Sequence, residues 1–145
     1  MELDSLYQAV ILDHYKQPHH KGLPVGEFQV RHINPNCGDE ITLSLSIEDG
    51  KVTNLIWDGV GCSISQASAS IMSDLVDGKS IESAGKVLQE FTELMQSKGS
   101  KSGDEEILED AIALAGVSKF PARVKCALLS WMAFKDAAIQ NGAEL

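Results

Sequence analysis

Apolar residues in this chain follow two different spacings, and the boundary between them limits the folds that it can adopt. Over residues 41–48 apolar and polar side chains alternate strictly, which predicts a half-buried strand. Asp49 and Gly50 then predict a tight hairpin turn into another strand over residues 52–57. A shorter alternation at residues 28–32 predicts a strand before these two. Three such strands make an antiparallel meander, and its apolar face needs a cover.

Helices are predicted to cover this face, because apolar residues elsewhere in the chain are spaced three and four apart, which is the pattern of a helix. This pattern recurs in five segments: residues 3–14, 64–75, 80–95, 104–115 and 121–138. Ser80 and Asp104 suit helix starts, and Pro121 suits a first helical turn. Gly78 and Gly116 suit helix ends. We therefore expect an α+β fold, in which a three-stranded antiparallel sheet packs against a layer of about five helices, with residues 1–145 forming a single domain.

Composition and charge exclude several classes of protein. The chain is 43% hydrophobic and 23% charged, which is ordinary for a soluble globular protein. Its net charge of −9 makes nucleic acid and anionic membranes poor partners. No apolar run approaches the length of a membrane span, and the acidic, amphipathic N-terminus differs from a secretory signal. We therefore expect a cytoplasmic protein with reduced cysteines.

The three cysteines are dispersed, and none lies in a CxxC pair. This distribution argues against a disulfide framework, and it favours a thiolate site assembled by the fold. The alternative is three unrelated buried thiols. Cys37 lies in a turn between strands, and Cys62 lies where a strand meets a helix N-terminus that favours the thiolate. Cys126 follows Arg123 by about one helical turn, so this cation also favours a thiolate.

Several chemistries fit these residues. Three thiolates from Cys37, Cys62 and Cys126 plus the carboxylate of Asp39 make four ligands, the number that tetrahedral zinc requires. Asp39 equally suits a turn residue that bonds its own backbone. The same thiolates suit an iron–sulfur cluster, and ligand softness alone does not separate the two. A closed zinc site that only holds the fold together is a further interpretation.

Four motifs carry a family resemblance: LDHYKQP at 12–18, NPNCGD at 34–39, GVGCSISQAS at 59–68 and FPARVKC at 120–126. Together they resemble the iron–sulfur assembly proteins of the IscU/SufU (NifU N-terminal) type, which implies a SufE/NifU-like fold. Within that family the chain is similar to the SufU branch. Lys125 occupies the position where the scaffold branch carries a histidine, and extra chain near residues 97–106 resembles the SufU insertion.

The resemblance implies zinc on Cys37, Asp39, Cys62 and Cys126, together with sulfur transfer. A pyridoxal-phosphate-dependent cysteine desulfurase of the SufS type would donate persulfide sulfur to Cys37, with Arg123 steadying the reacting sulfur. The sulfur would then pass to downstream iron–sulfur assembly proteins. This activity is sulfurtransferase-like, and whether the chain is an enzyme in its own right stays open. The alternative is a scaffold on which Cys37, Cys62 and Cys126 hold a [2Fe–2S] cluster before transfer.

The four histidines are expected to lie outside this site. His14 falls on the apolar face of the first helix, and His32 alternates inward on a strand, so core positions are predicted for both. His19 and His20 are predicted to lie on a loop surface.

Overall fold

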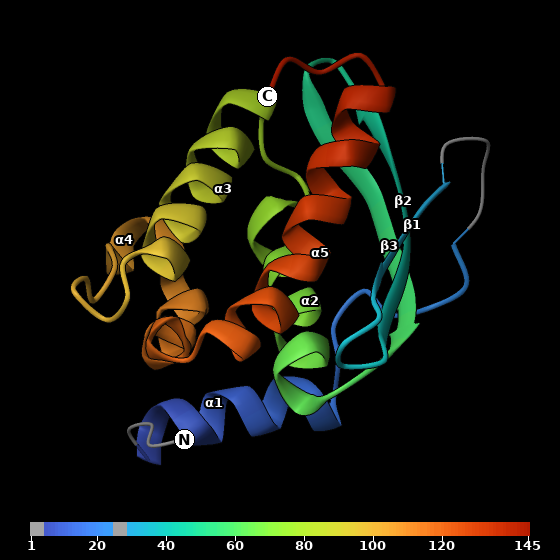
Figure 1. The fold of residues 1–145 in the computed structure, drawn as a ribbon. Helices are drawn as coiled ribbons and strands as arrows, with labels where there is room; N and C mark the ends of the chain where they lie inside the picture. The colour runs from blue at the N-terminus through green and yellow to red at the C-terminus, as the bar shows by residue number, and fades with distance from the viewer. Residues whose placement is uncertain (1–4, 25–28) are drawn as a thin grey trace.

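A computed structural model describes residues 5–24 and 29–145 of the chain, and Figure 1 shows how its elements are arranged. The elements follow in the order α1 (Ser5–Lys16), β1 (Gln29–Asn34), β2 (Asp39–Glu48), β3 (Lys51–Val60), α2 (Ser63–Val76), α3 (Ile81–Gln96), α4 (Glu105–Leu108), the 3₁₀ helix η1 (Glu109–Lys119) and α5 (Pro121–Gln140).

The sheet is an antiparallel meander in the order β1-β2-β3, as the sequence predicts. Asp49 and Gly50 both have positive φ, 52° and 73°, which is the geometry of a two-residue hairpin turn. The strand predicted at residues 28–32 begins at Gln29, and Phe28 lies outside the described residues. The alternating apolar side chains of β2 point into the core: Ile41, Leu43 and Leu45 are buried.

The helices lie on one side of the sheet, with α5 and α2 between the sheet and α3 (Figure 1). Trp131 of α5 stacks on Phe91 of α3 with ring centroids 4.1 Å apart. Its Nε1–H donates to Ser68 Oγ of α2 at 2.9 Å, and Ser68 Oγ donates to the carbonyl of Ala127 at 2.6 Å. These buried contacts fix α2 and α5 relative to each other and confirm the α+β prediction.

The predicted helix boundaries are mostly confirmed. Ser80 Oγ accepts the N–H of Ser83 at 3.2 Å at the start of α3, and Pro121 occupies the first turn of α5. Gly78 follows α2 with a φ of 81°. None of the helices in the described part of the chain is long and apolar enough to cross a membrane.

The helix predicted over residues 104–115 is wrong beyond its first turn. Asp104 caps α4 by accepting the N–H of Glu106 at 3.0 Å, but the chain then continues as the 3₁₀ helix η1, which runs through Gly116. Buried Ala111, Leu114 and Val117 recur every third residue, which suits a 3₁₀ helix, whereas buried Ala113 and Ser118 do not follow this period.

Two further predictions on core positions are wrong. The helical spacing over residues 3–14 predicts a buried face that includes Leu3 and Leu6, but Leu6 is 67% exposed, and Leu3 lies outside the described residues. Ile11 and His14 of that helix are buried. His32 is only half-buried, because its Nε2 reaches Asp136 at the edge of α5, 2.9 Å away, rather than entering the core.

Candidate metal centre

Three segments that are distant in sequence place their donor atoms together. Cys37 lies in the turn before β2, Asp39 is the first residue of β2, and Cys126 lies in the second turn of α5. The Sγ atom of Cys126 donates to the Sγ atom of Cys37 at 3.3 Å. The two sulfur atoms and a carboxylate oxygen of Asp39 all lie within 4.8 Å of one another. The fold thus forms a compact group of two sulfurs and one oxygen.

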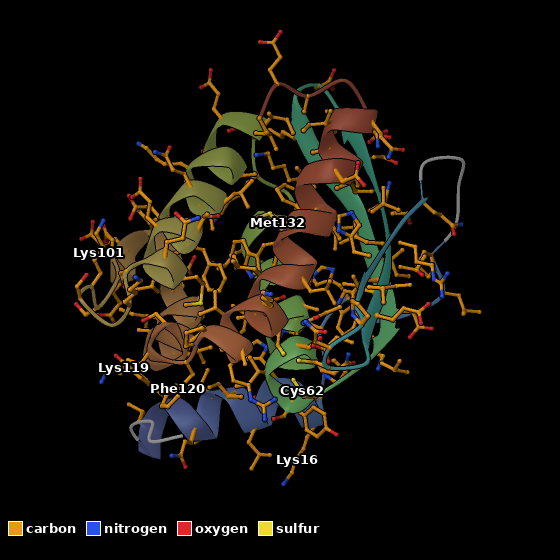
Figure 2. The ribbon with its side chains drawn as sticks, in the orientation of Figure 1. Lys16, Cys62, Lys101, Lys119, Phe120 and Met132 are labelled. Atoms are coloured by element: carbon orange, nitrogen blue, oxygen red, sulfur yellow. The ribbon has the colours of Figure 1, made fainter. Side chains whose placement is uncertain are left out.

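Cys62 borders this group through its backbone. It is the residue before the first turn of α2, and its N–H donates to Asp39 Oδ1 at 3.0 Å. Its sulfur does not belong to the group of mutually close donor atoms. Figure 2 shows Cys62 at the start of α2, at the same end of the molecule as Phe120, the residue before α5. The structure therefore brings all four predicted residues to one end of the fold.

Asp39 is completely buried, and its environment leaves half of the carboxylate without a partner. Oδ1 accepts the Cys62 N–H, but Oδ2 has no hydrogen-bond partner among the described residues. Gly61 makes this position possible, because a Cβ on it would lie 2.4 Å from Asp39 Oδ1. The turn interpretation of Asp39 explains neither the burial nor the unpaired oxygen, since a turn aspartate bonds its own backbone.

The electrostatics differ from expectation at one cysteine. Burial raises the pKa of Cys126, and the neighbouring Asp39 carboxylate and Cys37 sulfur raise it further. The favourable effect expected from Arg123 is therefore outweighed at Cys126 by burial, which is the largest cause of this pKa shift. Arg123 does lie beside the sulfurs: the thiolates of Cys62 and Cys126 raise the pKa of its exposed guanidinium.

A divalent cation fits this arrangement. A buried carboxylate with an unpaired oxygen is costly without a counter-charge, and two adjacent sulfurs are the soft ligands that zinc and iron–sulfur clusters take. A bound cation would displace the proton that burial retains on Cys126. The residues in place to hold it are Cys37, Asp39 and Cys126, with Cys62 adjacent.

Cys37 borders an open space. A pocket of about 270 Å³ lies beside it, and its lining residues are Asn34, Asn36, Cys37, Pro121, Ala122 and Lys125. The buried amide nitrogen of Asn34 has no hydrogen-bond partner among the described residues. The sequence analysis did not assign Asn34 to the site, although it lies three residues before Cys37.

Comparison with known proteins defines the class. The family model for the NifU-like N-terminal domain matches residues 6–127, so the chain belongs to this family. It is 47% identical, over 97% of its own length and 95% of the relative's, to the zinc-dependent sulfurtransferase SufU of Bacillus subtilis. It is 43% identical to the iron–sulfur cluster assembly scaffold protein IscU of Streptococcus pyogenes, over 94% of this chain and 84% of that protein.

Solved structures share this fold. A crystal structure of a protein described as hypothetical superimposes with a TM-score of 0.83 at 43% identity, covering 93% of this chain and 98% of that one. The resemblance to the IscU/SufU type and the predicted fold are thereby confirmed.

Proposed function

We propose that this chain is a zinc-binding sulfur acceptor of iron–sulfur cluster assembly that works in the cytoplasm. The observation that carries the proposal is the group of Cys37, Cys126 and the buried carboxylate of Asp39, with Cys37 opening to a pocket. The SufU relative, named a zinc-dependent sulfurtransferase, supports it.

Each residue has a proposed role. Cys37, Asp39, Cys62 and Cys126 would hold the zinc ion, which keeps sulfur ligands deprotonated when bound. Cys126 and Asp39 are buried, so they serve as anchors. Cys37 and Cys62 are both half-buried, and Cys37 also lines the pocket, so Cys37 would be the sulfur that an incoming donor reaches.

The donor would be the persulfide of a pyridoxal-phosphate-dependent cysteine desulfurase of the SufS type. The thiolate of Cys37 attacks the terminal sulfur of that persulfide. A new S–S bond forms on Cys37 while the donor's S–S bond breaks, and the donor's cysteine leaves as a thiolate. One sulfur atom moves, the total charge is unchanged, and no oxidant or reductant is consumed. Arg123 and Lys125 supply positive charge beside the persulfide anion, which would then serve downstream assembly proteins.

The test is sulfur transfer from such a desulfurase supplied with cysteine, followed by mass spectrometry of the alkylated chain. The wild-type chain should gain one sulfur atom on the peptide that contains Cys37, and the Cys37→Ser variant should gain none. The Cys62→Ser variant separates acceptor from ligand, because it should retain acceptance at Cys37 with weakened zinc. Undiminished transfer to Cys37→Ser would overturn the acceptor assignment. Unfolding of every cysteine variant without effect on the desulfurase would instead indicate a structural zinc module.

A scaffold is the second candidate, and the IscU relative, named a scaffold protein, favours it. In that case Cys37, Cys62 and Cys126 would hold a [2Fe–2S] cluster. Anaerobic reconstitution with iron and sulfide distinguishes the two candidates. A stoichiometric cluster that transfers to an apo-ferredoxin would favour the scaffold, and iron that is displaced by equimolar zinc without transfer would favour the sulfur acceptor.

A further inference from the structure

Three histidines and three aspartates gather at a second position in the fold. One nitrogen of His14, one nitrogen of His19 and one carboxylate oxygen of Asp74 all lie within 4.8 Å of one another. The rings of His14 and His19 are 4.8 Å apart between centroids. We propose that His14, His19 and Asp74 form a second metal site that takes a divalent first-row ion such as Zn²⁺. This proposal does not depend on the proposed function.

The site is separate from the cysteine centre. Asp74 lies eleven residues after Ser63 in α2, and this places it roughly 16 Å along the helix axis from the end that carries Cys62. None of its residues touches the sulfur group in the contacts of the described chain. Two imidazoles and one carboxylate are the ligand set of sites that hold zinc or iron(II) and leave positions for water.

The backbone of His19 is fixed, so its ring is held over α2. The N–H of His19 donates to Ser70 Oγ at 2.8 Å. Its carbonyl accepts from Trp57 Nε1 at 2.9 Å and from Ser73 Oγ at 3.2 Å. The Nδ1 atom of His19 is hydrogen-bonded to Asp74 Oδ2. A loop residue with this many anchors carries a pre-positioned ligand rather than a freely moving side chain.

His14 is supported from both sides of its ring. Nδ1 lies 2.7 Å from Ser70 Oγ, and Nε2 lies 2.9 Å from Asp110 Oδ2. A metal ion at either nitrogen would replace one of these contacts, and the other would orient the ring. Metal-bound histidines characteristically have such a partner at the second nitrogen, often a carboxylate.

Charge and space also favour a cation. His20 Nε2 lies 3.3 Å from Asp74 Oδ1, and its other nitrogen lies 4.0 Å from Asp77. A hollow of about 130 Å³ beside the group exceeds the volume that one water molecule needs. Its lining residues are His14, Ile71, Asp74, Leu75, Glu109 and Asp110. Lys79 lies 3.8 Å from Glu109. The carboxylates of Asp74, Glu109 and Asp110 around the hollow carry more negative charge than this lysine offsets. Side-chain exposures of 45% for His19 and 40% for Asp74 give an ion access from solvent.

The test is a Zn²⁺ titration of the full chain after treatment with a chelator, followed by the ring-nitrogen NMR signals of the four histidines. The first equivalent should leave the histidines unchanged, and the second should shift His14 and His19 together. His32 is an internal control, because it also faces one aspartate, Asp136, but belongs to no group of potential metal ligands among the described residues.

Variants make the result decisive. His19→Gln and Asp74→Asn should each weaken the second Zn²⁺ at least about tenfold, the minimum loss expected even for a supporting residue. His32→Gln should bind both ions like the wild-type chain, and Asp39→Ala should retain the second ion while losing affinity for the first. Circular dichroism checks that each variant is folded. Zn²⁺ binding that shifts neither His14 nor His19, or that shifts His32 as much as His19, would overturn the proposal.

Discussion

Asp39 Oδ1 accepts the backbone N–H of Cys62 at 3.0 Å, and this bond ties the turn that carries Cys37 to the N-terminus of α2. A single carboxylate therefore connects two of the cysteine segments through one oxygen and leaves its other oxygen unpaired.

Replacing Asp39 by Asn should separate these two roles of the carboxylate. The amide oxygen can still accept the Cys62 N–H, but the buried negative charge is removed. We expect the chelator-treated variant to be at least as stable as the wild-type chain, because an unpaired buried charge is costly. Its zinc affinity should fall at least about tenfold. Urea unfolding with and without zinc measures both effects, and a metal-free variant much less stable than wild type would contradict this interpretation.

Gly61 should not tolerate a side chain. A Cβ would lie 2.4 Å from Asp39 Oδ1, so Gly61→Ala must displace the carboxylate, at about 1–3 kcal/mol in unfolding free energy and with weaker zinc binding. Gly78→Ala is the matched control: its φ of 81° is also strained for alanine, but no atom lies within 4 Å of the added carbon. Equal zinc affinities for the two variants would show that the contact with Asp39 is unimportant.

Arg123 should affect sulfur transfer more than metal binding or stability. Its guanidinium is exposed beside the sulfurs, so Arg123→Ala should change the unfolding free energy by less than about 0.5 kcal/mol. The rate of sulfur acceptance should fall about tenfold, because an anionic persulfide approaches a less positive surface. Lys119→Ala, an exposed cation at the end of η1 (Figure 2), is the control. A loss of zinc from Arg123→Ala would instead make Arg123 part of the metal site.

Stability of the metal-free chain should decrease at alkaline pH. Burial raises the pKa of Cys126 in the folded state, so the unfolded chain loses this proton first as the pH rises. The contribution of this thiol to the unfolding free energy is fully present below the ordinary thiol pKa of about 8.5. Above that pH the unfolding free energy declines by up to about 1.4 kcal/mol per pH unit. Urea unfolding at a series of pH values checks this, and Cys126→Ala should show a smaller slope. The same slope in both proteins would contradict the assignment.

Ser68 should matter for stability because it satisfies two buried groups at once. Ser68→Ala removes the acceptor of Trp131 Nε1 and the donor to the Ala127 carbonyl, at a cost of about 1–3 kcal/mol. Ser102→Ala, in the exposed segment after α3, should have almost no effect. Thermal unfolding of the two variants tests this, and equal midpoints would mean that packing alone joins α2 to α5.

The sheet and most helices could be predicted because local signals agreed with the fold. The alternation in β2 and the turn at Asp49 and Gly50 each specify one conformation. The conformation of the segment after Asp104 could not be predicted, because its alanines fit an α-helix and a 3₁₀ helix equally well. Only packing against the core selects the 3₁₀ helix. Leu6 has helical spacing, yet it is 67% exposed, because helical spacing alone does not show how far the rest of the fold covers α1.

The cysteines of the site could be proposed from sequence, but their ionisation could not. The pKa of the Cys126 thiol depends on how deeply α5 is buried as well as on Arg123. Residue spacing in the sequence does not show how deeply a helix is buried. Clustering of His14 and His19 with Asp74 was equally hidden, because it joins a helix and a loop to a residue more than fifty positions later.

Cys37 and Cys126 are 89 residues apart in sequence and 3.3 Å apart in space. An ion that joins them would act as a cross-link, and in the chain-entropy model a covalent link across a loop of this size is worth about 4–5 kcal/mol. Metal occupancy would then also determine how rigidly these two segments are held together. A chain that gives up one sulfur ligand to accept cargo would at the same moment loosen the connection between its first and last thirds, so loading and rigidity would change together.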